Sequence, residues 1–181
     1  MKKENVSRRN FLKTVGVAGL GSVITAKQGI AQTRAVPPAA VPTVPLRPFG
    51  KTGAKVSMLS LGGIFDITLN QLVLQRALDF GVTYWDTATS YTNGNSEKGI
   101  GMYFEKNPEA RKKVFLVTKA GGSHTAEALN KMVDLSLERM KTDYIDLFFL
   151  HGVGDGADLN DEVKAWAEKA KASKKIRFVD R

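Results

Sequence analysis

The stretch Val82-Thr-Tyr-Trp-Asp-Thr-Ala-Thr-Ser-Tyr91 decides how the rest of the chain is interpreted. Its first half is rich in β-branched and aromatic residues, which is the composition of a buried strand. A carboxylate, Asp86, stands where this apolar run ends, and small or hydroxylated residues lead from it to the phenol of Tyr91. A carboxylate at the end of a strand and a tyrosine in the following loop form two parts of a candidate proton-transfer site.

Two further polar residues stand at equivalent points downstream. Lys119 ends the apolar run 114–119, and His151 ends the run 144–151. Lys119 follows Asp86 by 33 residues, and His151 follows Lys119 by 32, which is about the length of one strand plus one crossover helix. Polar groups at the carboxyl ends of successive parallel strands build the active site of a (β/α)₈ barrel. The spacing therefore predicts an α/β fold of this kind.

Composition excludes several classes of function. The chain has 181 residues, of which 43% are hydrophobic, and a formal charge of +9. Residues 1–31 carry +5 of this charge, and the remaining +4 is spread among acidic residues without a basic stripe, which argues against nucleic-acid binding. The absence of cysteine excludes disulfides and thiolate metal sites. Two histidines are too few for a multi-histidine centre, so we expect no metal.

The N-terminus, residues 1–31, is predicted to be a signal peptide. Residues 7–13, Ser-Arg-Arg-Asn-Phe-Leu-Lys, resemble the twin-arginine export motif, and a glycine-rich apolar segment follows that is too short for a stable membrane span. Small residues at Gly29 and Ala31 suit a signal peptidase. We therefore expect cleavage after Ala31 and export to the periplasm by the twin-arginine machinery. The alternative is a chance arginine pair before an apolar helix, which the order of the three features disfavours.

Beyond a proline-rich, stiff linker at residues 32–46, the pattern of residues 47–181 alternates between strands and helices. Gly50 and Gly53 indicate a hairpin, and Ser96 is a candidate helix cap. The glycine pair at 62–63 is interpreted equally well as a simple turn or as a close approach of the backbone to a ligand. Strands are predicted at 56–61, 82–85, 114–119, 144–151 and 174–179, and helices at 69–80, 96–106, 129–140 and 160–170.

Asp86, Tyr91, Lys119 and His151 together suit the reduction of a carbonyl. Hydride transfer to the carbonyl carbon leaves charge on oxygen, which a nearby acid must neutralise. An ammonium beside a phenol favours its ionised form and makes it a better acid, and a carboxylate can balance that ammonium. Each residue alone has a structural explanation, as a loop aromatic, a turn acid, a snorkelling lysine or a strand-end histidine. Their joint placement favours the chemical interpretation.

The residues from Arg47 to Val179 resemble the aldo-keto reductases. The resemblance implies an NADPH-dependent carbonyl reductase, with NADH as the second choice of cofactor, on a (β/α)₈ barrel. It also implies that Tyr91 is the acid, that Lys119 and Asp86 tune it, and that His151 positions the substrate. Gly63, Ile64 and Phe65, together with Asp86, would lie near the nicotinamide. The segments that carry the resemblance are Phe49-Gly-Lys-Thr-Gly-Ala-Lys-Val-Ser, Leu61-Gly-Gly, Trp85-Asp-Thr-Ala, Gly94-Asn-Ser-Glu-Lys-Gly-Ile-Gly, Val114-Phe-Leu-Val-Thr-Lys, Ser136-Leu-Glu-Arg-Met-Lys-Thr-Asp-Tyr-Ile-Asp-Leu and Leu150-His-Gly.

The family pattern continues into three more strand–helix units, and a barrel of this type has about 250 residues. We therefore expect a barrel truncated to about five strands and four helices, either from a shortened reading frame or as a fragment that self-associates through open barrel edges. Residues 32–181 alone are expected to be oligomeric, aggregated or molten, without measurable NADPH-dependent turnover.

Two other function classes compete with the reductase. One is a non-catalytic half-barrel that acts as a binding or assembly module. Quenching of Trp85 or Trp166 fluorescence by the cofactor would favour the reductase over this module. A barrel hydrolase or lyase is disfavoured because its usual metal ligands or paired carboxylates are missing from the sequence.

The export signal predicts the outcome of one double substitution. Arg8→Lys/Arg9→Lys should leave the protein in the cytoplasm at precursor length, because the motif requires both arginines. Cell fractionation and immunoblotting measure this. Unchanged export and processing of the double variant would contradict the prediction.

Overall fold

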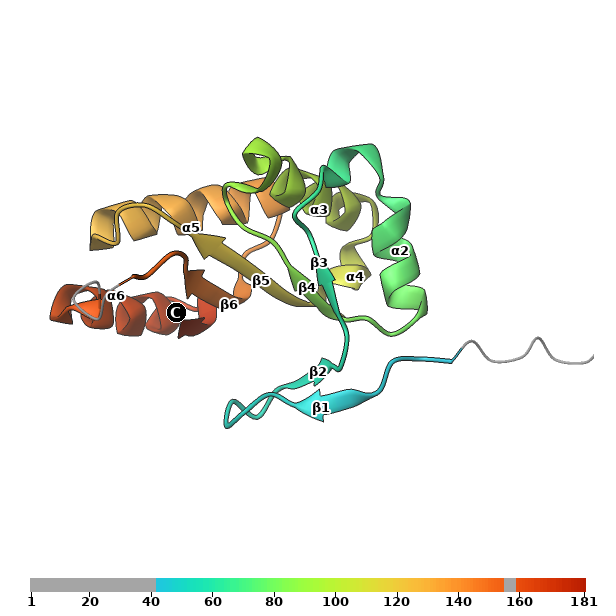
Figure 1. The fold of residues 1–181 in the computed structure, drawn as a ribbon, viewed down its shortest axis with the longest axis horizontal. Coiled ribbons are helices and arrows are strands. Elements are labelled where there is room, and N and C mark those ends of the chain that lie inside the picture. Colours follow the sequence, from blue (N-terminus) through green and yellow to red (C-terminus); the bar gives the residue numbers. More distant parts are fainter. Residues whose placement is uncertain (1–41, 155–158) are drawn as a thin grey trace, which may run out of the picture. The chain divides into compact units, whose positions relative to one another are not determined.

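The computed structural model describes residues 42–154 and 159–181 of the chain, so the predicted signal peptide and most of the predicted linker lie outside the described residues. Two short strands form an antiparallel hairpin, in which Leu46 pairs with Ser57. Five parallel strands form one sheet in the order β3-β4-β5-β6-β7 (Figure 1). The strands are β1 (Leu46–Pro48), β2 (Lys55–Ser57), β3 (Ser60–Gly62), β4 (Tyr84–Asp86), β5 (Phe115–Ala120), β6 (Ile145–Leu150) and β7 (Ile176–Asp180).

A helix connects each neighbouring pair of parallel strands, as expected for repeated β-α-β units. The sheet of five strands and the four longer helices confirm the predicted partial barrel, whereas the four-residue helix α4 was not predicted. No helix within the described residues is long and apolar enough to cross a membrane. The helices are α2 (Leu72–Asp79), α3 (Asn95–Lys106), α4 (Pro108–Arg111), α5 (Ala126–Met140) and α6 (Asp161–Ala172), with 3₁₀ turns η1 (Ile67–Leu69) and η2 (Tyr91–Gly94).

The predicted strand at 56–61 is wrong, because it is two strands belonging to two sheets. β2 pairs with β1, whereas β3 pairs with β4 in the parallel sheet. The chain bends between them at Met58 and Leu59, whose side chains are exposed. Ser57 fixes the bend, since its hydroxyl donates to the Leu59 carbonyl at 2.6 Å and accepts from the Thr83 amide at 2.9 Å. An apolar run alone does not reveal such a hydroxyl-stabilised bend.

The prediction that Ser96 caps its helix is also wrong. Gly94, with φ of +86°, is the N-cap of α3 and makes no side-chain capping bond. Ser96 is instead fully buried and donates to the Gly63 carbonyl at 2.5 Å. A Cβ added at Gly101 would lie 2.0 Å from the Arg139 carbonyl oxygen, and one at Gly99 would lie 2.6 Å from Ile67. These glycines therefore let α3 approach α5 and η1 closely, and that packing stabilises a helix of low intrinsic propensity.

Alternating side chains of the strands build two separate cores. One core lies between the sheet and its helices and includes Trp85, Leu116 and Phe148. The other lies on the opposite face, where Phe115, Val117 and Leu147 pack with residues of the hairpin. In Figure 1 the hairpin lies at one end of the sheet. It thus covers one end of the inner face and leaves the carboxyl end of the strands for a site.

Tyr84 lies on this inner face beneath the predicted site. Its ring stacks on Phe115 with centroids 5.5 Å apart, and Phe49 of the hairpin contacts both rings. Burial raises the pKa of Tyr84 to about 12, with smaller contributions from the negative charges of Asp86 and Asp180. The aromatic floor of the inner face therefore contains a phenol that stays neutral well into the alkaline range.

This pKa predicts a slope in stability at alkaline pH. The pKa of Tyr84 rises from 10.0 to about 12 on folding, so its contribution is complete below about pH 10 and is lost as pH rises towards 12. Tyr84→Phe should remove this part of the alkaline decline in the free energy of unfolding. Urea unfolding of both proteins between these pH values measures it. Curves that stay parallel would contradict the prediction.

Candidate active site

The parallel sheet brings the four predicted catalytic residues to one edge. Asp86 is the last residue of β4, Lys119 is the penultimate residue of β5, and His151 directly follows β6. Asp86 is in register with Val117, and Lys119 with Phe149. Because parallel strands end at the same edge of a sheet, residues separated by more than 30 positions become neighbours. The loop after β4 then returns Tyr91 to the same edge.

Lys119 is the centre of this group. Its Nζ lies 2.6 Å from Asp86 Oδ1, 2.9 Å from the Thr87 carbonyl oxygen and 3.5 Å from the Tyr91 hydroxyl. The Lys119 side chain is 14% exposed and that of Asp86 28%. A lysine withdrawn from water to this degree requires a counter-charge, which Asp86 supplies at hydrogen-bond distance. The ammonium is thereby held next to the phenol.

Tyr91 and His151 face each other across the site. Their rings are edge to face, with centroids 6.3 Å apart and planes inclined by 83°. The Lys119 Nζ lies 5.0 Å from the centroid of the Tyr91 ring, so the cation borders the aromatic face as well as the hydroxyl. A phenol, an ammonium and an imidazole therefore converge on one region. This set can donate a proton to an oxygen and can orient that oxygen by hydrogen bonding.

Residues 64–179 match the sequence model described as the Aldo/keto reductase family. This match covers more than half of the chain and all four converging residues. The chain belongs to the aldo/keto reductase family.

Individual aldo/keto reductases agree with this assignment. The chain is 32% identical over 148 residues to the aldo-keto reductase yakc [NADP(+)] of Schizosaccharomyces pombe, covering 76% of this chain and 42% of that protein. It is 39% identical over 109 residues to the methylglyoxal reductase YeaE of Escherichia coli, covering 58% of this chain and 35% of that protein. The aldo-keto reductase AKR11C1 from Bacillus halodurans in its holo form superposes with a TM-score of 0.68 at 29% identity, covering 76% of this chain and 49% of that one. This chain thus spans less than half the length of these relatives.

The loop after β3 is connected to the site through Gly63. The Gly63 amide donates to the Asp86 carbonyl at 2.7 Å. A Cβ at Gly63 would lie 2.8 Å from that oxygen and 2.9 Å from Ser96 Oγ, so only glycine fits there. Of its neighbours, Ile64 is 70% exposed, whereas Phe65 is half-buried and packs against the helix-side core. The sequence left open whether the glycine pair is a simple turn or a close approach to a ligand. At Gly63 the close approach is to other parts of this chain, the Asp86 carbonyl and the Ser96 hydroxyl.

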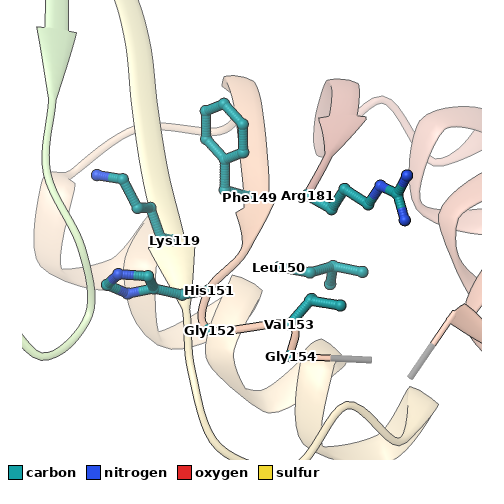
Figure 2. Close-up of a pocket in the computed structure, with 8 residues that line it drawn as sticks. All are labelled: Lys119, Phe149, Leu150, His151, Gly152, Val153, Gly154 and Arg181. Carbon is teal, nitrogen blue, oxygen red and sulfur yellow. The ribbon is translucent and has the colours of Figure 1, made fainter. Parts of the chain in front are cut away.

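A cavity of about 520 Å³ opens beside Lys119 and His151. Figure 2 shows these two side chains pointing to the same side, whereas the Arg181 guanidinium extends the opposite way. The remaining lining consists of Phe149, Leu150, Gly152, Val153 and Gly154. Its size and its apolar walls with few polar tips are those of a small-molecule site. Apolar walls with the polar tips of Lys119 and His151 suit a flat ring beside a polar oxygen.

The described residues 42–154 and 159–181 contain no group of three His, Asp or Glu side chains placed to hold a metal ion. The Lys119 ammonium, paired with Asp86, places a positive charge beside Tyr91.

Sequence reasoning missed three residues that support the site from behind. The Thr87 carbonyl accepts from Lys119, and Glu97 and Arg139 form a buried ion pair under the Tyr91 loop. The sequence contains an indication for Glu97, because it lies at helical spacing from the apolar residues Ile100 and Phe104, which are buried. A charged residue on the apolar face of a helix requires a partner. The identity of that partner, 42 residues away, is visible only in the fold.

Proposed function

We propose that the barrel to which this chain contributes reduces aldehydes or ketones with NADPH, Tyr91 being the proton donor. The observation that carries the proposal is the position of the Lys119 Nζ, 2.6 Å from Asp86 and 3.5 Å from the Tyr91 hydroxyl, at the carboxyl edge of the sheet. Family membership supports the class of reaction. NADPH is preferred to NADH because the S. pombe relative is named for NADP(+).

Each residue has a distinct role in this proposal. The nicotinamide, when bound, supplies the hydride. Tyr91 donates its proton to the carbonyl oxygen, and the Lys119 ammonium stabilises the phenolate that remains. Asp86 and the Thr87 carbonyl hold that ammonium in place at 2.6 and 2.9 Å. His151, edge to face with Tyr91, orients the carbonyl oxygen by hydrogen bonding.

The two ligands are assigned to different parts of the carboxyl edge. The cavity beside His151 is proposed for the carbonyl compound. Gly63, Ile64, Phe65 and Asp86, which lie outside the lining of that cavity, are proposed to border the nicotinamide. Small dicarbonyl compounds are a reasonable first substrate, because the E. coli relative is named a methylglyoxal reductase. The cavity of about 520 Å³ is large enough for such a molecule beside the ring.

The proposed localisation of the protein is the periplasm, which it would reach by the twin-arginine route. The support is the order of motif, apolar segment and small residues in the sequence of 1–31. That route carries folded proteins, and a reductase that has already bound its cofactor is suited to it.

One substitution tests the proposed acid. Residues 42–181 fused to the carboxyl-terminal strands of the B. halodurans reductase complete an eight-stranded barrel, and this fusion should oxidise NADPH in the presence of methylglyoxal. Tyr91→Phe should lower kcat by about 10²- to 10⁴-fold, the usual size of general acid catalysis, without weakening NADPH binding. Absorbance at 340 nm measures turnover, and quenching of tryptophan fluorescence measures binding.

Tyr144→Phe is the matched control, because it deletes a hydroxyl from a ring that packs under Arg111 at 3.7 Å, outside the site. It should leave turnover unchanged. A folded fusion in which Tyr91→Phe turns over as fast as the unaltered protein would remove Tyr91 from its role.

Self-association is a second proposal, and it rests on the sheet edges. Within the described residues, β3 pairs only with β4, and β7 only with β6. Phe149 and Phe178 also lie half-buried on the inner face. Open strand edges and apolar surface favour association. The polypeptide of this sequence should therefore elute as a dimer or larger species without NADPH turnover, as measured by size-exclusion chromatography with light scattering. A monomer at all concentrations, or a chain that turns over alone, would contradict this.

The alternative function, a non-catalytic half-barrel module, remains distinct from the reductase. Its favouring observation is the same pair of open edges, which offer backbone hydrogen bonds to a partner. Cofactor titration separates the two, since only the reductase requires nicotinamide quenching of Trp85 or Trp166.

A further inference from the structure

We propose that the buried ion pair between Glu97 and Arg139 is a positioning device that sets the separation of Lys119 and Tyr91. Neither member of the pair contacts the cavity, whose lining comes from other residues. The pair lies behind the site, between α3 and α5. Glu97 contacts the Thr118 side chain of β5, and Arg139 contacts the backbone of the Tyr91 loop. The inference rests on the proposed function only for the role of Tyr91 as proton donor beside Lys119.

Glu97 holds the strand that carries Lys119. Its side chain is fully buried, and its Oε1 accepts from Thr118 Oγ1 and from Ser136 Oγ, each at 2.7 Å. Thr118 directly precedes Lys119 in β5, and successive side chains of a strand point to opposite faces. Glu97 therefore holds β5 from the helix side while Lys119 extends into the site on the other side.

Arg139 holds the loop that carries Tyr91. Its Nη1 donates to the Thr89 carbonyl at 3.0 Å and to Glu97 Oε2 at 3.2 Å. The guanidinium also lies against Gly94, since a Cβ added there would fall 2.5 Å from its central carbon. Arg139 thus contacts the loop on both sides of Tyr91, two residues before it and three residues after it.

The loop requires such support because its backbone is strained. Thr92, Asn93 and Gly94 have φ values of +47°, +55° and +86°. A residue other than glycine is strained in the left-handed region, and a β-branched residue such as Thr92 is strained most. Thr92 and Asn93 therefore favour release of the loop unless surrounding contacts hold it. The hydrogen bond from Arg139 to the Thr89 carbonyl is the charged contact that opposes this release.

A purely structural role explains these contacts less well. A buried ion pair rarely adds stability over an apolar packing of similar volume, because desolvation offsets the attraction. Here Glu97 also accepts a hydrogen bond from Thr118 of β5, and Arg139 also donates one to the Thr89 carbonyl of the Tyr91 loop. The arrangement links the two backbone segments whose side chains meet in the site.

The test is hydrogen exchange of the full chain with Glu97→Gln/Arg139→Gln, which keeps the interior neutral. The amides of Thr89, Tyr91 and Asn93 are hydrogen-bonded within the loop and to the Lys119 carbonyl. They should exchange about tenfold faster or more, the factor expected for loss of one hydrogen bond to a charged group. Exchange in β6 should stay unchanged. Mass spectrometry of peptides measures this in any oligomeric state.

The matched control is the other deeply buried ion pair of the described residues, between Arg111 and Asp146. Arg111→Gln/Asp146→Asn should accelerate exchange near Leu116, whose amide donates to Asp146 at 2.9 Å, but not in 88–94. Equal effects of both double variants on the loop, or no effect of the first, would overturn the proposal. If the first double variant does not fold, Arg139→Lys replaces it; unchanged loop exchange in that variant overturns the proposal equally.

A second readout reports on the phenol itself. The chain has four tyrosines, so incorporation of 3-fluorotyrosine gives few ¹⁹F resonances, and Tyr91→Phe identifies that of Tyr91. This resonance should shift in Glu97→Gln/Arg139→Gln while that of Tyr144 stays in place, a response that simple destabilisation does not produce. A shift together with full turnover of the Tyr91→Phe fusion would refute the proposed function alone. An unmoved Tyr91 resonance would refute the positioning role alone.

Discussion

The fold of this chain depends on keeping a lysine ammonium out of water beside a carboxylate. Lys119 is 14% exposed and lies 2.6 Å from Asp86. Neither group could be buried alone, because an isolated buried charge costs several kcal/mol or more. Asp86 and Lys119 lie 33 residues apart in sequence. They meet because β4 and β5 run parallel and end at the same edge, with Asp86 in register with Val117. Local structure, strand order and the site are thus linked by one contact.

The alternation of side chains along β5 extends this dependence through the sheet. Phe115, Val117 and Lys119 face the interior with the hairpin and the site, whereas Leu116 and Thr118 face the helices. Polar residues lie at the carboxyl end of both faces, and apolar residues lie below them. The strand therefore has an apolar lower half that is packed on both sides and an upper end where each side carries a charge partner. Within the six residues of β5, the first residues pack in the two cores and the residues near the carboxyl end contact the charged groups of the site and its support.

The sequence allowed the parallel sheet, its helices and the convergence of four residues to be predicted, because strand-end residues at intervals of 32 and 33 depend only on chain order. It did not allow the bend at Met58 or the N-terminus of α3 to be predicted. Both depend on buried hydroxyls, those of Ser57 and Ser96, which bond to a distant or non-helical backbone atom. The hydroxyl of serine suits caps, bends and interior bonds alike, so propensity cannot choose among them. Glu97 and Arg139 were missed for a related reason, since a polar residue on a helix is assumed to face water.

Close packing of helices explains why those two charges meet. Gly101 allows α3 to approach the Arg139 carbonyl so closely that any side chain would collide with it. The approach brings Glu97, one helical turn earlier, within reach of the Arg139 guanidinium and of Ser136. A glycine that weakens α3 as an isolated helix is therefore what allows an ion pair to form behind the sheet. The same spacing leaves room for the guanidinium against Gly94, where the strained loop ends and α3 begins. In this chain the small residues of α3 determine, through the charges they bring together, where the phenol of Tyr91 lies.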